Sequence, residues 1–314
     1  MNTPGPRFDI LGFGAVTLDD FAYIDAYPPA DAKVAVRRKE RQCGGLTGTA
    51  LVAAARLGGK CAYAGVLGTD EISDYLIRSL ESSRVDVSHV RRDPAVRPIH
   101  AFIVVDETHQ TRNIFVDLNG GSGAGDQWPP EEFIRSTRVL FVDHIGVPGM
   151  LRAAQLCRSN GIPVVADFER TPGPDFPKLL AAADHVILSR TFAAKLTGES
   201  TPERAARSLF DSSRTLVAVT GGHEGCWYIE ANHPGEVQHQ PAFTVEVVDT
   251  TGCGDVFHGA YALALSRGDD VATRIRFASA AAAIKATHRG GQAGIPGLPA
   301  VNAFLNDRVG RIPQ

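Results

Sequence analysis

Residues 247–264 read VVDTTGCGDVFHGAYALA, and this stretch predicts the architecture of the chain around it. Val247 and Val248 are β-branched, which suits the end of a strand. Gly252 and Gly254 permit a tight turn, and the apolar residues that follow recur at helical spacing. The stretch therefore predicts a strand, a short glycine loop and a helix that begins at the loop.

The glycine loop is suited to holding an anion. The backbone N–H groups of Gly252, Cys253 and Gly254 would point toward one place, at the positive end of the helix dipole. Asp255 would lie in the first turn, where the dipole would leave its carboxylate ionised and able to accept a proton from a hydroxyl. Phosphoryl transfer needs both parts. From spacing alone, a helix-capping acid and a plain turn explain these residues equally well.

Two separated signatures make the chain similar to a known family. Residues 249–257 resemble the C-terminal signature of the ribokinase-like (PfkB) carbohydrate kinases, with Cys253 where the family usually has alanine. A Gly-Gly signature at 43–58 and a matching tail at 289–296 lie in the family's order. The resemblance implies one α/β domain over residues 1–314, a ribokinase-like sandwich with a central, mainly parallel sheet and a small β-sheet lid. It also implies an ATP-dependent phosphotransferase with an alcohol group as acceptor.

Composition argues against several other classes of protein. The chain has 314 residues and 44% hydrophobic content, ample for a buried core. A formal net charge of −3, without long runs of one sign, argues against nucleic acid or a membrane surface as the main partner. No apolar stretch is long enough to span a membrane, so we expect a cytoplasmic enzyme. The five cysteines are widely spaced and indicate neither a disulfide framework nor a zinc site.

The sugar side of the expected site lies early in the chain. Residues 8–13 form a short apolar run typical of a buried parallel strand, and ligands meet such sheets beyond the ends of their strands. Asp19 follows this run, and the resemblance implies that its carboxylate binds sugar hydroxyls. Gly44 and Gly45 would let the backbone approach a sugar closely, ahead of a helix expected over 51–57. Thr49 stands where the family usually has asparagine, which suggests a different sugar preference.

The lid is expected as an insertion at about 19–40 and 97–118. Its strands are predicted at 21–25, 33–39, 99–105 and 112–116. Asp31 and Lys33 are candidates for contact with substrate, although a solvated rim explains them as well. Arg112 matches an arginine that many family members place near the active site, where it can meet phosphate or a sugar oxygen. A plain surface arginine is the competing interpretation.

The resemblance also implies a nucleotide site and two kinds of cation. Residues expected to contact ATP are Thr220, Gly222, Gly225, Thr251 and Gly291. The family's Asn-x-x-Glu motif is replaced by Ser189 and Phe192, so Mg²⁺ would be held mainly by phosphates and water, with Asp167 or Glu169 nearby. Many relatives bind a monovalent cation through backbone carbonyls, and K⁺ is therefore expected at Asp249 and Thr251.

The substrate is the least determined part of the prediction. The C-terminal third looks most like bacterial sulfofructose kinases, and residues 27–49 match animal ketohexokinases in spacing. Lys33 matches a sulfonate-binding lysine, but Val116 and Ile145 stand where the matching asparagine and arginine would be. We therefore expect a neutral ketohexose such as fructose and a homodimer formed through the lid. Sulfofructose, a nucleoside, or a regulator that binds nucleotide and sugar without turnover are the alternatives.

Overall fold

The computed structural model describes residues 5–109, 111–117 and 123–308. Within these residues, nine strands form one sheet in the order β15-β14-β13-β12-β11-β10-β1-β4-β6. The strands from β6 to β13 run parallel, and β14 and β15 are antiparallel to their neighbours. The strands are β1 (Phe8–Gly12), β4 (Cys61–Tyr63), β6 (Val85–Asp86), β10 (Thr137–Val142), β11 (Val164–Asp167), β12 (His185–Ser189), β13 (Leu216–Thr220), β14 (Cys226–Glu230) and β15 (Gln238–Gln240).

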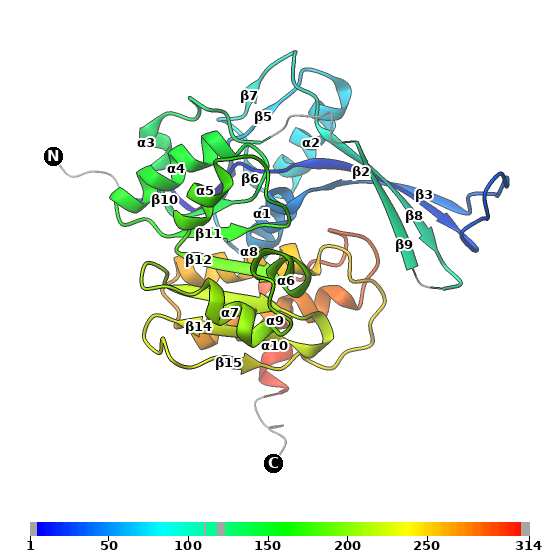
Figure 1. Cartoon of the computed structure of the whole chain (residues 1–314). Coiled ribbons are helices and arrows are strands. Elements are labelled where there is room, and N and C mark those ends of the chain that lie inside the picture. The colour runs from blue at the N-terminus through cyan, green and yellow to red at the C-terminus, as the bar shows by residue number, and fades with distance from the viewer. Residues whose placement is uncertain (1–4, 110, 118–122, 309–314) are drawn as a thin grey trace.

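Helices cover both faces of this sheet (Figure 1). On one face lie α1 (Leu46–Arg56), α8 (Cys253–Ser266) and α9 (Val271–Ala286), with α10 (Leu298–Asn306) against α9. On the other lie α4 (Val147–Ser159), α5 (Phe176–Ala181), α6 (Arg190–Thr197) and α7 (Pro202–Leu209). The remaining short elements are α2 (Glu71–Ser82), α3 (Glu131–Ile134), η1 (Gly222–Glu224), β5 (Val66–Leu67) and β7 (Arg91–Arg92). The α/β sandwich that the sequence predicts is confirmed.

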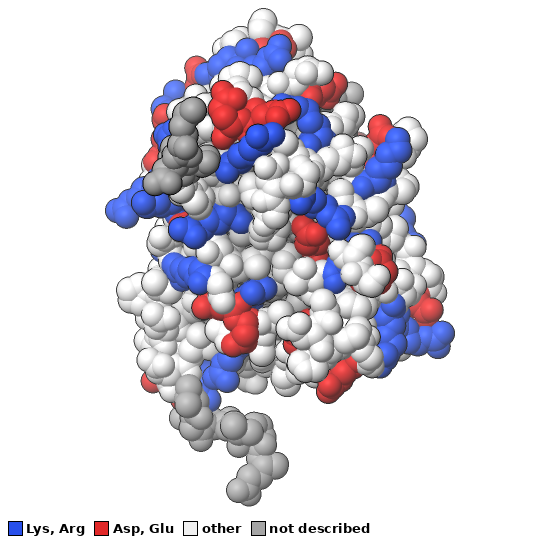
Figure 2. All heavy atoms as spheres, turned by 90° about the vertical axis from the view of Figure 1, so that its left-hand side faces the viewer, with Lys and Arg blue, Asp and Glu red and all other residues white. Residues whose placement is uncertain are grey.

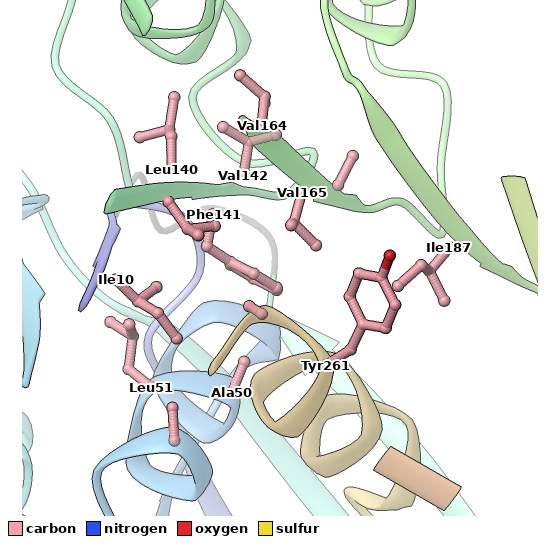
Figure 3. Packing of buried hydrophobic residues seen from close by; sticks show 14 of the residues in the cluster. Ile10, Ala50, Leu51, Leu140, Phe141, Val142, Val164, Val165, Ile187 and Tyr261 are labelled. Atoms are coloured by element: carbon pink, nitrogen blue, oxygen red, sulfur yellow. The ribbon is translucent and has the colours of Figure 1, made fainter. Parts of the chain in front are cut away.

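The core lies on both faces of the sheet, and one part of it lies between the sheet and the helix pair α1 and α8. A Cβ on Gly259 of α8 would lie 2.1 Å from the carbonyl oxygen of Ala50 in α1, so glycine allows the two helices to touch. Figure 3 shows Leu51 of α1 and Tyr261 of α8 on the side of the sheet toward which Phe141 of β10 points. All three are buried. This contact fixes the start of α8 relative to the ends of the strands.

A second sheet of four strands projects from the sandwich (Figure 1). Its order is β3-β2-β8-β9, and its strands are β2 (Thr17–Ile24), β3 (Arg38–Gly44), β8 (Ile99–Asp106) and β9 (Thr111–Asp117). The predicted small sheet is therefore present. The strand expected over 33–39 is wrong, because the ladder with β2 pairs residues 38–44 instead. Residue 118, the last of the expected insertion, lies outside the described residues.

One helix also begins earlier than the sequence indicated. The glycines near residues 44–48 suggested a loop before a helix over 51–57, but α1 begins at Leu46. Gly45 takes a φ of 87°, and a Cβ there would lie 2.5 Å from the carbonyl oxygen of Ala15. The turn is thus confined to Gly45, and the buried helix continues through Gly48 because packing outweighs the low helix propensity of glycine.

The surface turned away from the small sheet carries mixed charge. Figure 2 shows basic and acidic side chains interspersed over this face. No helix among the described residues is long and apolar enough to cross a membrane.

Candidate active site

Three backbone amides at the start of α8 have no backbone acceptor within the described residues. Gly252 has a φ of 76° and caps the helix, and Val256 donates the first helical bond to the carbonyl of Gly252 at 2.9 Å. Cys253 donates to the carbonyl of Thr250 at 3.2 Å. Within the described chain, the amides of Gly252, Gly254 and Asp255 bond no other backbone group. These three are the donors available to an anion, so the Cys253 amide expected among them is engaged elsewhere.

Asp255 lies half-buried in this first turn, beside the free amides. Burial, followed by the negative charges of Asp167 and Glu169, raises the pKa of Asp255 well above its ordinary value. Desolvation and like charges thus oppose the stabilisation of the ionised carboxylate that the helix dipole was expected to provide. A raised pKa suits a general base, which must both hold and release a proton near the working pH.

Asp143 is a buried carboxylate that the sequence did not single out. It follows β10 and accepts hydrogen bonds from the Ala15 amide at 2.6 Å, the Thr47 hydroxyl at 2.8 Å and the Ile145 amide at 2.7 Å. A Cβ on Gly14 would lie 2.1 Å from its Oδ2. Asp143 therefore ties the loop after β1 to the start of α1. Its position at the end of a predicted buried strand is the feature of the sequence that could have marked Asp143 as a site residue.

Asp167 ends the neighbouring strand β11 and is also buried. Its Oδ2 has no hydrogen-bond partner, although His258 Nδ1 is 3.3 Å away. That nitrogen lies closer to the Gly254 carbonyl, at 2.7 Å, than to this carboxylate oxygen. An orphaned carboxylate oxygen is a fitting ligand for a hard cation such as Mg²⁺. No cluster of three metal-ligating side chains exists among the described residues, so phosphates and water would complete such a site.

Asp19 of β2 faces the same region. The Thr17 hydroxyl donates to its Oδ1 at 2.8 Å, and a Cβ on Gly44 would lie 2.1 Å from its Oδ2. Glycine at 44 therefore makes room for this carboxylate. Burial raises the pKa of Asp19 to about 6. The charge of Asp19 also contributes to the raised pKa of Asp255, so the structure brings these two predicted residues together.

The loop that follows α9 contacts both the lid and α1. The Gly291 amide donates to Gln42 Oε1 at 3.0 Å, and Gln292 Nε2 donates to the Thr49 hydroxyl at 3.2 Å. Thr49 is buried. The candidate nucleotide residue Gly291 and the candidate sugar residue Thr49 are thereby connected. Gln42 and Gln292 were not predicted, because their partners are more than 200 positions away in the chain.

The lid candidates fall into two groups. Asp31 and Lys33 are exposed in the connection between β2 and β3, at the outer end of the lid (Figure 1). The structure does not bring them to Asp255. Arg112 on β9 is exposed, but its positive charge acts on both Cys253 and Lys285 near the start of α8. Arg112 is therefore placed to approach the anion site.

The second glycine loop lies at the end of β13, next to α6. Gly222 and Gly225 both have positive φ, 60° and 101°, and a Cβ on Gly225 would lie 2.2 Å from the Gln240 carbonyl oxygen. The Thr220 hydroxyl donates to the Leu188 carbonyl at 3.4 Å. These contacts fix the loop at the carboxyl edge of the sheet, where ligands bind in parallel sheets.

Ser189 and Phe192, which stand where the family's Asn-x-x-Glu motif would be, have structural roles here. Ser189 caps α6 by accepting from the Phe192 amide at 3.2 Å, and Phe192 is buried. Neither residue offers a carboxylate to the site.

Asp249 holds the glycine loop in place through hydrogen bonds to its carboxylate and to its carbonyl oxygen. Its carboxylate accepts from the Thr251 and Gly290 amides, both at 2.8 Å, while its carbonyl accepts from Lys285 Nζ at 2.9 Å. The Thr251 hydroxyl is buried without a partner. Burial raises the pKa of the Cys253 thiol to about 11, so this cysteine is not a reactive thiolate at neutral pH. The carbonyl expected to bind K⁺ thus holds an ammonium group.

Known proteins resemble this chain over nearly its whole length. The chain is 31% identical to the ATP-dependent ribose-1-phosphate kinase of Halopiger xanaduensis, over 95% of this chain and 98% of that protein. It is 25% identical to the ribokinase of Staphylococcus aureus, over 93% and 98% of the two chains. A solved structure from Agrobacterium tumefaciens, provisionally identified as a ribokinase, matches with a TM-score of 0.90 at 28% identity, covering 98% of this chain and 100% of that one.

These similarities agree with the geometry of the site. The model of the pfkB family carbohydrate kinases matches residues 12–298, which contain the small sheet, the strands of the large sheet after β1, the carboxylates and the start of α8. Members of this family transfer a phosphoryl group to an alcohol group of a sugar. The chain therefore belongs to the pfkB family of carbohydrate kinases.

Proposed function

We propose that this kinase transfers the γ-phosphoryl group of ATP to a primary hydroxyl of a small neutral sugar, with a ketohexose such as fructose as the first candidate. One observation carries the proposal. The carboxylate of Asp255 lies beside the free amides of Gly254 and Asp255 itself, and Asp19 is close enough to influence its pKa. A proton acceptor, backbone amides that can bind an anion, and a carboxylate that can bind hydroxyls are thus adjacent.

The proposed mechanism uses these groups in order. Asp19 accepts hydrogen bonds from sugar hydroxyls and orients the acceptor oxygen toward Asp255. Asp255 then takes the hydroxyl proton as the oxygen attacks the γ-phosphorus in line. The bond between the γ-phosphorus and the β–γ bridging oxygen breaks and ADP leaves, while the free amides stabilise charge on the transferred group. Mg²⁺, when bound with ATP, would neutralise phosphate charge, with Asp167 and Glu169 as the protein groups suited to hold it through water. The lid excludes water, which would compete as acceptor.

The ATP site is proposed at the second glycine loop and the loop after α9. Thr220, Gly222 and Gly225 would meet the nucleotide from β13, and Thr251 and Gly291 from the side of α8. The name of the Halopiger relative specifies ATP. Arg190 supports the loop, since its Nη1 donates to Glu224 Oε1 at 2.8 Å.

Charge at the site favours a neutral sugar over an anionic one. Asp19, Asp143, Asp167, Glu169 and Asp255 act on one another electrostatically. A sulfonate or sugar phosphate would be repelled by this cluster unless a cation paired with it. Val116 and Ile145 cannot supply that pairing. Ribose is the second candidate, because the relatives include ribokinases from several bacteria.

A substrate panel would test the proposal. ADP release would be measured with MgATP and fructose, tagatose, ribose, 2-deoxyribose, ribose 1-phosphate, sulfofructose and adenosine. We expect strong turnover with one neutral sugar. Turnover of adenosine alone would make the chain a nucleoside kinase. Binding of both ATP and a sugar without turnover would favour a regulator.

The base is tested by Asp255→Asn, which keeps the shape of the side chain. Loss of the proton acceptor should lower kcat by about a thousandfold, while ATP affinity measured by calorimetry stays within about twofold. Asp20→Asn is the matched control, because Asp20 is bound by Arg41 on the other face of the lid. Turnover of Asp255→Asn at the wild-type rate would contradict the mechanism.

We also propose that the chain forms a homodimer through the lid. The support is the apolar surface of β8 and β9, where Phe102 and Phe115 are each about half exposed and directly paired. β9 is an edge strand, and such edges are usually covered.

A further inference from the structure

Lys285 is an unusual residue for the end of a helix. It lies in the last turn of α9, yet its side chain is fully buried, with 0% exposure. A buried ammonium group is costly unless polar groups replace its hydration. Among the described residues it forms no ion pair with a carboxylate at contact distance. Its role must therefore be sought in the backbone groups around it.

Those groups are carbonyl oxygens at the base of the glycine loop. Lys285 Nζ donates to the carbonyl of Asp249 at 2.9 Å and to the carbonyl of His288 at 3.4 Å. Both oxygens lie near the negative end of the α9 dipole, which favours a cation. One ammonium group thus joins the residue that opens the glycine loop to the loop that follows α9.

The same two loops are in contact at two further points. The Gly290 amide donates to Asp249 Oδ2 at 2.8 Å, and a Cβ on Gly252 would lie 2.6 Å from the carbonyl oxygen of Gly291. The position of the free amides of Gly254 and Asp255 therefore depends on the contacts that Asp249 makes. A shift of about 1 Å in such a positioned donor can lower a rate by about a hundredfold.

A separate monovalent cation does not fit beside this ammonium group. The Asp249 carbonyl that would bind it is already bonded to Lys285 Nζ. Two positive charges about 4 Å apart repel each other strongly in a poorly hydrated site. The positive charge of Arg112 also acts on Lys285, which disfavours further positive charge there.

We infer that the ammonium group of Lys285 takes the place of K⁺ and positions the glycine loop at the start of α8. It is a positioning residue, since it acts on the transferred group through Asp249 and the loop amides. This inference rests on the proposed function for its kinetic readout, but its structural readout does not. The kinase should then work equally well with and without K⁺.

The first experiment uses the unmodified protein. Melting temperature and kcat are measured in KCl, NaCl and tetramethylammonium chloride at equal ionic strength, the last cation being too large for a carbonyl site. We expect both quantities to agree among the three salts, with kcat within about 1.5-fold. Activation by K⁺ of about fivefold or more, or a K⁺-specific rise in melting temperature, would overturn the inference.

The second experiment removes the charge by Lys285→Met, which keeps the length of the side chain. In tetramethylammonium chloride we expect a lower melting temperature and a kcat about tenfold lower or more, with the KM for sugar little changed. K⁺, NH₄⁺ or methylammonium should restore part of both losses, which a purely structural lysine would not show. Lys195→Met is the matched control, since Lys195 lies exposed in the last turn of α6.

The outcomes are distinct. A Lys285→Met variant that folds, and whose melting temperature and kcat respond to none of these cations, contradicts the inference. If the variant does not fold, the salt comparison on the unmodified protein decides. If no sugar is turned over, the proposed function fails, while the melting temperatures still test Lys285.

Discussion

Asp19 and Asp20 are adjacent on β2, yet the pKa values of their carboxyl groups shift in opposite directions. Asp19 and Asp20 differ by one residue, so their side chains point to opposite faces of the lid. Arg41 binds Asp20 through two bonds of 2.8 Å and, with burial opposing it, lowers the pKa of that carboxyl. Burial raises the pKa of Asp19 to about 6. The residue facing the site is thus the one that titrates near neutral pH.

Sugar affinity should therefore fall in acid. Only the ionised form of Asp19 accepts hydrogen bonds at both oxygens, and this form is lost as pH falls below about 6. From about pH 7 to about pH 5, we expect the Kd of the best sugar to rise about tenfold by calorimetry. Asp20→Asn should keep this dependence, and Asp19→Asn should remove it. A Kd for the wild type that is flat over this range would contradict the assignment.

At the scale of elements, the loop after α9 connects the lid to the nucleotide side. Gln42 of β3 accepts from the Gly291 amide, and Arg289 Nη1 donates to Glu107 Oε1 next to β8 at 3.1 Å. The loop also reaches Thr49 in α1. Movement of the lid would therefore be transmitted to the segment proposed to cover ATP.

Sugar and ATP should accordingly bind with positive coupling. We expect a non-hydrolysable ATP analogue to bind about fivefold more tightly when sugar is present, because both ligands favour the same lid position. Gln42→Ala removes the acceptor of the Gly291 amide and should reduce this coupling to about twofold or less. Glu81→Ala, at an exposed position on α2, is the control. Coupling that is unchanged in Gln42→Ala would show that the contact does not transmit it.

At the scale of the whole molecule, the lid leaves apolar surface uncovered. Phe102 pairs with Phe115, and Asp20 pairs with Phe102, so these rings lie on the lid face away from Asp19. They are 49% and 50% exposed. A second copy is the partner we propose for this surface.

Light scattering should then give the mass of a dimer. Phe115→Asp places a charge within the apolar surface and should shift the mass to that of a monomer at about micromolar concentration. The melting temperature should change little beyond the loss due to dissociation. A monomeric wild type at working concentration would contradict the proposal.

The sequence alone was enough to predict the fold class and the elements that carry the proposed site. Two separated glycine signatures and the strand before Asp19 predicted the sandwich and the small sheet, and the helix predicted after Gly252 is present as α8. These succeeded because each depends on local properties: apolar periodicity, the φ range of glycine, and amides at a helix start.

Strand register, pKa shifts and burial depend on residues that are distant in the sequence, so only the tertiary structure shows them. The strand expected over 33–39 lies at 38–44 because the ladder with β2 sets the register. The pKa of Asp255 is raised because the fold buries it and brings Asp167, at the end of β11, and Glu169 near it. Lys285 is buried because the end of α9 lies beside Asp249, whose carbonyl accepts a hydrogen bond from its Nζ. Desolvation and charge pairing depend on neighbours in space, which the order of residues does not contain.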